Sequence, residues 1–176
     1  MIWLALLACK PAAEITSVAC DYCDGDCTDD TQTATQFSHV AGDVTYDAPP
    51  PMSGDHSSCW TAWGVHDEDP GDEYWVHNLE HGGVVFLYQP ADCATGDSAE
   101  SCGDQVAALE AVLSPPTDAR WIIAPYDALP SSWGAVSWEH RRLMGCFDLG
   151  AMVEFFNDHV AHGREDVSTD PPESCM

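Results

Sequence analysis

The chain is poor in basic residues. Only 5 of its 176 residues are lysine or arginine, against 30 aspartates and glutamates, so the formal net charge is −25. A surface of this charge repels the phosphates of nucleic acids and of anionic lipid headgroups, so we expect no nucleic-acid partner. It attracts cations in general and does not by itself indicate a specific metal. The only adjacent basic pair, Arg141-Arg142, is expected to bind carboxylates of the domain itself.

The N-terminal region lacks a hydrophobic run long enough to cross a bilayer. The apolar stretch from Ile2 to Ala8 is far shorter than the roughly 20 residues of a spanning helix. Leu6-Leu7-Ala8-Cys9 instead has the form of a bacterial lipobox, with an ordinary signal peptide as the alternative. We therefore expect residues 1–9 to be a lipoprotein signal that ends at a lipidated Cys9. The exported protein would be lipid-anchored in the cell envelope, at the periplasmic face of the outer membrane or at the cell surface.

Cysteine, in contrast, is abundant. Nine cysteines are unusual for a reducing cytosol, and an even set of eight remains when Cys9 is set aside. Cys20, Cys23 and Cys27 have a spacing that a metal or iron–sulfur cluster could use, but their acidic context and an oxidising compartment favour disulfides. Cys93 and Cys102 flank a short loop and are expected to pair locally; the other pairings do not follow from the sequence. The disulfide candidates are Cys20, Cys23, Cys27, Cys59, Cys93, Cys102, Cys146 and Cys175.

The apolar pattern indicates one globular domain at residues 37–166. An acidic, cysteine-containing tether at 10–36 precedes it, and a polar tail at 167–176 follows it. The expected core elements are strands at 84–88, 121–126 and 135–144 and helices at 104–113 and 149–159. Their order predicts an α/β domain, with α+β as the alternative, in which two main helices pack on a small mixed sheet.

The most informative stretch is Val76 to Gly83, which reads V-H-N-L-E-H-G-G. His77 and His81 are four residues apart, so one helical turn would place both imidazoles on the same face. Two glycines then end the turn before an apolar strand. Upstream, the prolines of segment 48–56 exclude a helix and provide a rigid support for His56. The sequence therefore predicts a transition-metal site formed by His56, His77 and His81.

Two segments resemble a known family. Y-D-A-P-P-P-M-S-G-D-H at 46–56 and W-V-H-N-L-E-H-G-G-V-V-F-L-Y at 75–88 are similar to the PPxSGxH and HNLEHGG motifs of domain of unknown function family 3105. The resemblance covers roughly residues 37–166. It implies an exported or membrane-anchored bacterial protein and singles out His56, His77, Glu80 and His81, without assigning an activity. His66 and Trp138-Glu139 depart from the family pattern.

The metal and its fourth ligand are less determined than the three histidines. Three imidazoles suit copper, zinc, nickel or iron. We favour copper, with zinc next, because the protein is expected to be exported and Met52 or Met144 could add a soft ligand. The fourth ligand is left open among Glu80, Met144, His140 and water. His39 lies at the domain edge and is not assigned to the site.

The sequence thus predicts a cell-envelope lipoprotein that binds copper or zinc as a carrier, buffer or sensor. A non-enzymatic interaction module with structural histidines is the first alternative. A metal-dependent hydrolase or oxidase with Glu80 as acid–base is the second. The H-x-x-E-H spacing of His77 to His81 also occurs in inverzincin proteases, but Gly82-Gly83 would interrupt the long helix that those enzymes need.

Overall fold

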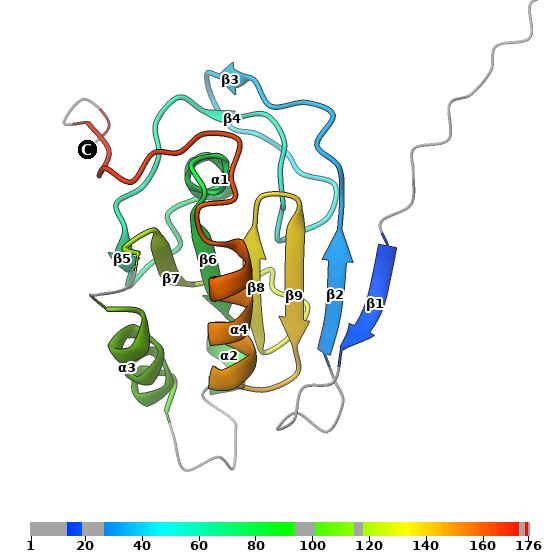
Figure 1. The fold of residues 1–176 in the computed structure, drawn as a ribbon, viewed down its shortest axis with the longest axis vertical. Helices are drawn as coiled ribbons and strands as arrows, with labels where there is room; N and C mark the ends of the chain where they lie inside the picture. The colour runs from blue at the N-terminus through cyan, green and yellow to red at the C-terminus, as the bar shows by residue number, and fades with distance from the viewer. Residues whose placement is uncertain (1–13, 19–26, 94–100, 115–117, 173–174, 176) are drawn as a thin grey trace, which may run out of the picture.

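The computed structural model in Figure 1 describes residues 14–18, 27–93, 101–114, 118–172 and 175. Within these residues, seven strands form one mixed sheet in the order β1-β2-β9-β8-β6-β7-β5. Their bounds are β1 Glu14–Val18, β2 Cys27–Thr31, β5 Gly64–Val65, β6 Val84–Tyr88, β7 Trp121–Pro125, β8 Trp133–Ser137 and β9 His140–Met144. A separate parallel pair consists of β3 (His39–Val40) and β4 (His56–Ser57). The predicted α/β class with a mixed sheet is confirmed.

Helices cover both faces of the sheet. Along β6 the side chains alternate, so Val84 and Phe86 face one side while Val85 and Leu87 face the other. The first side packs against α3 (Cys102–Leu113) and α4 (Leu149–His159), whose positions agree with the two predicted helices. The second side packs against α1 (Asp72–Glu80). A short helix, α2 (Pro90–Cys93), follows β6.

The segment predicted as a single strand at 135–144 is a hairpin. β8 and β9 pair in antiparallel register, with Ser137 opposite His140. The turn between them places Glu139 at φ 67°, a left-handed conformation that hairpin turns require. The Glu139 carboxylate accepts a hydrogen bond from the Ala34 backbone N–H at 2.6 Å. Alternation alone does not reveal such a tight turn, because both strands bury residues along their length.

Part of the predicted tether belongs to the sheet. β1 pairs with β2, and β2 pairs with β9, so the interpretation of 10–36 as a tether does not describe residues 14–18 and 27–31. Asp29 accepts two hydrogen bonds from Arg142 at 2.7 and 2.9 Å, and Asp30 accepts two from Arg141 at 3.0 and 2.5 Å. Asp29 and Asp30, whose acidity suggested a linker, therefore form ion pairs with the adjacent arginines of the neighbouring strand β9. Residues 1–13, including Cys9, lie outside the described residues.

Disulfide bonding is confirmed at several of the predicted cysteines. Cys59 is bonded to Cys175, which attaches the predicted polar tail to the domain. Cys27, Cys102 and Cys146 are also disulfide-bonded. Cys20, Cys23 and the Cys93 side chain lie outside the described part of the structure. Among the described residues, no helix has the length and apolar character needed to cross a membrane.

The start of α1 predicts a pH dependence of stability. Burial raises the pKa of Asp72 from 3.8 to about 6, while the Tyr126 hydroxyl, which donates to its Oδ2 at 3.1 Å, opposes this rise. Between these two values the folded state holds a proton that the unfolded chain has lost, so the free energy of unfolding falls as pH rises. Asp72→Asn should remove this fall and raise the free energy of unfolding by about 1 kcal/mol at pH 7, a figure reduced for the partial exposure of the carboxyl.

Urea unfolding of wild type and Asp72→Asn at pH values from 4 to 7 checks this prediction. His159 contributes a slope of opposite sign, because burial lowers its pKa to about 4. Subtracting the free energy of unfolding of one protein from that of the other at each pH removes the contribution of His159. A difference that does not change with pH would contradict the assignment to Asp72.

Candidate metal centre

His77 and Glu80 lie on α1, three residues apart and therefore on one side of the helix. Both are about 2% exposed, because β4, Trp60 and Arg164 cover them, while the neighbouring Trp75, Val76 and Leu79 pack against the sheet. The helix ends at Glu80, and Gly82 follows with φ 83°, a conformation that favours glycine. The predicted turn is thus the last part of a nine-residue helix that the glycines terminate, as expected.

The helix is also tied to the loop that precedes it. The Asn78 side chain accepts a hydrogen bond from the Thr61 N–H and donates one to the Thr61 carbonyl, each at 3.0 Å. A side chain at Gly83 would overlap the Trp63 ring and the Asn78 carbonyl. Asn78 and Gly83 of the H-N-L-E-H-G-G motif therefore hold the end of the helix in place.

His56 lies on β4 and is completely buried. β4 pairs in parallel with β3, and His39 and His56 are register partners. The Nδ1–H of His56 donates to the Gly54 carbonyl at 2.9 Å, and its backbone N–H donates to the Ser38 carbonyl at 3.1 Å. The proline segment thus ends in a fixed His56, as predicted, and the strand pairing places His39 beside it.

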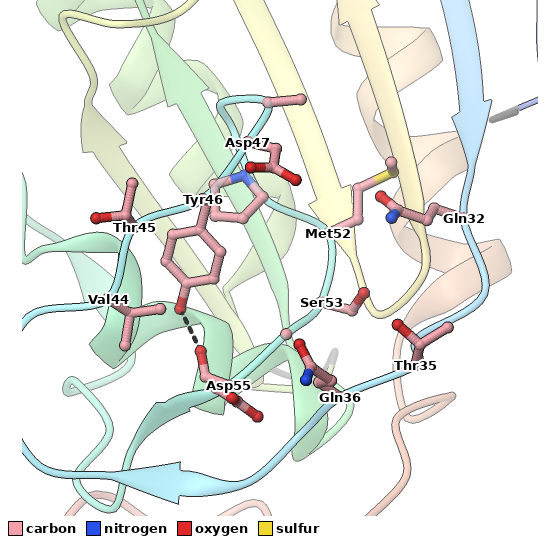
Figure 2. A pocket seen from close by; sticks show the side chains of 13 residues that line it. Gln32, Thr35, Gln36, Val44, Thr45, Tyr46, Asp47, Met52, Ser53 and Asp55 are labelled. Carbon is pink, nitrogen blue, oxygen red and sulfur yellow. Dashed lines mark hydrogen bonds between the residues drawn. The ribbon is translucent and has the colours of Figure 1, made fainter. Parts of the chain in front are cut away.

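Tyr46 holds the segment that precedes His56 in place (Figure 2). The Tyr46 hydroxyl donates to the Asp55 carbonyl at 2.8 Å. Burial raises the pKa of this hydroxyl, so it remains a donor. Tyr46, Gly54 and Asp55 also line a cavity of about 350 Å³ that none of the histidines enters. We assign the Tyr46 contact a structural role, because it fixes the turn that presents His56.

Four side chains converge between these elements. His39, His56, His77 and Glu80 each offer a ligand atom, and these atoms all lie within 4.8 Å of one another. The ring centroids of the three histidines are 4.7 to 5.0 Å apart. A tetrahedral ion with bonds of about 2 Å holds its ligand atoms about 3.3 Å apart, so small side-chain movements would complete the coordination. The cluster could therefore hold a metal ion.

The hydrogen bonds from His56 and His77 to the backbone determine which ring nitrogen of each histidine faces the cluster. His77 Nδ1 donates to the Ser57 carbonyl at 2.8 Å, as His56 Nδ1 does to Gly54. Each Nε2 consequently faces the cluster, the arrangement typical of metal-binding histidines. Burial, followed by the neighbouring His81, lowers the pKa of His77 to about 3, so its imidazole is neutral at physiological pH.

Glu80 supplies the only carboxylate of the cluster. Its Oε2 lies 3.0 Å from His56 Nε2, and its Oε1 accepts a hydrogen bond from Arg164 at 2.5 Å. Because His56 Nδ1–H is already used, the contact between Glu80 and His56 Nε2 requires a second proton on one of the two groups. A metal ion bound to both atoms would replace that proton.

His81 lies on the far side of His77 and outside the group of four. The two rings are 4.4 Å apart, and Trp60 packs on both of them. His81 Nε2 is 3.5 Å from Glu165 Oε2, and its Nδ1 has no hydrogen-bond partner among the described residues. The structure therefore brings together two of the three predicted histidines and adds His39, which the sequence-based interpretation left aside.

The other candidate ligands, Met144 and His140, lie elsewhere, and so does His66, one of the departures from the family pattern. Met144 is buried in the core on the α3–α4 side of the sheet, and the His140 ring packs against His159 at 4.5 Å. His66 donates to the Ala62 carbonyl at 2.8 Å. None of the three belongs to the cluster. His39 was missed because its position depends on a parallel pairing of two-residue strands, which no local pattern in the sequence indicates.

Of the comparisons with known proteins, one gives a match, and it includes the candidate metal centre. No curated protein and no solved structure matches the chain. A family model described as protein of unknown function (DUF3105) matches residues 39–174, a span that begins at His39 and includes the other three cluster residues. Because this match covers most of the 176 residues, the chain belongs to the DUF3105 family.

Proposed function

We propose that this protein binds one divalent transition-metal ion through His39, His56, His77 and Glu80. The observation that carries the proposal is the convergence of three imidazoles and one carboxylate within 4.8 Å, with three of the four side chains buried. A divalent cation among these imidazole nitrogens and the Glu80 carboxylate would gain ligands of the types that transition metals bind. The two backbone carbonyls that fix His56 and His77 supply the outer contacts that metal ligands need.

The donor set favours copper(II) first and zinc(II) next. Three imidazole nitrogens with one carboxylate oxygen suit both ions, and copper(II) generally binds such ligands more tightly. Copper(I) prefers sulfur, but Met144 is in the opposite core, Met52 lines the cavity that none of the histidines enters, and Cys59 is in a disulfide. The proposed metal is therefore a divalent ion, without the thioether ligand that the sequence alone suggested.

We further propose that the protein acts as a carrier or buffer in the cell envelope. The His39 side chain is 48% exposed and covers the three buried ligands, so an ion could enter and leave at this residue. The disulfides fit an oxidising compartment, and the lipobox at Cys9 fits a lipid anchor. Loss of the protein from the membrane fraction on Cys9→Ser substitution would support this location, and full retention would contradict it.

Metal titration of the purified protein tests the binding proposal. We expect one copper(II) or zinc(II) ion per chain with a Kd tighter than about 1 µM, measured in excess magnesium to saturate the acidic surface. His39→Ala should weaken binding at least about 10-fold, less than the loss of a buried ligand because water can take the place of this exposed side chain, whereas the matched His81→Ala should change it little. Binding no tighter than that of magnesium would overturn the proposal. Equal losses for both variants would contradict the choice of His39 as a ligand.

A further inference from the structure

The C-terminal segment after α4 forms one wall of the candidate metal centre. The Ala161 N–H donates to the Gly82 carbonyl and the Glu165 N–H donates to the Glu80 carbonyl, each at 2.8 Å. Gly163 lies so close to Gly82 that a Cβ atom would overlap its backbone. The segment therefore packs directly on the end of α1, where the cluster carboxylate is located.

Three consecutive side chains of this segment contact Glu80 or residues beside the centre. Arg164 donates to Glu80 Oε1, and its guanidinium stacks on the Phe37 ring at 3.5 Å. Glu165 lies 3.5 Å from His81 Nε2. Asp166 accepts from Arg120, which also donates to the His81 carbonyl at 3.4 Å. The position of Glu80 consequently depends on a residue 84 positions later in the chain.

The end of the segment is attached to the loop that holds His77. The Thr169 carbonyl accepts from the Nε1–H groups of Trp60 and Trp63 at 3.2 and 3.1 Å. Trp60 also packs on His77, with ring centroids 5.1 Å apart. The Cys59–Cys175 disulfide then closes the connection over a sequence separation of 116 residues.

Cys59 lies close, in sequence and in space, to Ser57, the residue that orients His77. Its backbone N–H donates to Ser57 Oγ at 3.0 Å, and the Ser57 carbonyl accepts the Nδ1–H of His77. Both cysteines are only partly buried, so a reductant can reach them. One bond thus holds both the loop that orients His77 and the segment that contacts Glu80.

We infer that the redox state of Cys59 and Cys175 controls the metal affinity of the His39–His56–His77–Glu80 cluster, an inference that rests on the proposed function. Reduction by a dithiol breaks the S–S bond and forms two cysteine thiols. The dithiol supplies two electrons and two protons and becomes a disulfide. The loop and the C-terminal segment then lose their covalent link, His77 and Glu80 lose preorganisation, and the ion binds more weakly.

The test uses variants, because soluble dithiols bind these metals themselves. We expect Cys59→Ala/Cys175→Ala to bind copper(II) or zinc(II) about 10-fold more weakly than the oxidised wild type, in the range found when outer contacts of metal ligands are lost. As the matched control, Cys102→Ala removes a disulfide at the start of α3, and its freed partner thiol is alkylated. It should bind like the wild type. Titrations are made at a temperature at which circular dichroism shows all three proteins folded.

Two outcomes would overturn the inference. The first is equal metal affinity of the double variant and the wild type. The second is tighter binding by wild type reduced with a phosphine, which would indicate that the freed thiols act as ligands. Hydrogen exchange without metal separates this inference from the proposed function, because faster exchange of the Glu165 and His81 amides in the double variant is expected even if no ion binds. Unchanged exchange at both amides would also contradict the mechanism.

Discussion

Replacing His56 or His77 by alanine should lower metal affinity at least about 100-fold. The estimate is a lower bound, because losing only an outer contact of a metal ligand costs about 10- to 100-fold. Both side chains are buried, and each has one nitrogen committed to a backbone carbonyl, so the remaining Nε2 is fixed toward the cluster. Replacement of either ligand by a neighbouring side chain would require rearrangement of β4 or α1. Isothermal titration with copper(II) and zinc(II) measures the loss.

His159→Ala is the matched control for this prediction. His159 is another imidazole whose pKa is lowered by burial, to about 4, but it packs against His140 and Phe155 away from the cluster. Its removal should change stability and leave metal affinity unchanged. If His56→Ala and His77→Ala bind metal as tightly as His159→Ala, the histidines of the cluster are structural and the interaction-module alternative is favoured.

Replacing Gly163 by alanine should have the largest effect on stability, a loss of more than about 3 kcal/mol in the free energy of unfolding. The added Cβ would overlap the backbone nitrogen of Gly82 and the carbonyl oxygen of Glu80. Backbone atoms cannot rotate away as a flexible side chain can, so the C-terminal segment must separate from the end of α1. That separation would also remove the contact between Arg164 and Glu80.

Gly150→Ala provides the comparison. Gly150 lies in the first turn of α4, where an added Cβ would meet only Asp148 Oδ1 at an ordinary 3.4 Å. Alanine favours helix more than glycine does, so this variant should be as stable as the wild type or slightly more stable. Urea unfolding of both variants measures the difference. A small and equal effect at the two positions would show that the segment is not packed against α1 as described.

The main helices and strands could be predicted because their patterns are local. Val84 to Tyr88 and Trp121 to Pro125 are continuous apolar runs, and the structure buries both as central parallel strands. The spacing in 149–159 predicts α4, since Met152, Phe155 and Phe156 form its buried face. The hairpin at Glu139 and the strand at 27–31 were not predicted, because a tight turn and an inter-strand ion pair depend on partners elsewhere in the chain.

The features of the candidate site also fall into two groups: local ones that the sequence predicts, and long-range contacts that it does not. The sequence by itself determined that His77, Glu80 and the two glycines belong to one terminated helix, and that a rigid proline segment presents His56. Helical spacing and the fixed φ of proline act within a few residues, so the motifs contain this information. Only the tertiary structure decided that His39 joins them through strand pairing, that His81 turns toward Glu165, and that Arg164 reaches Glu80. These contacts join residues far apart in the chain, and their positions depend on how the whole domain packs.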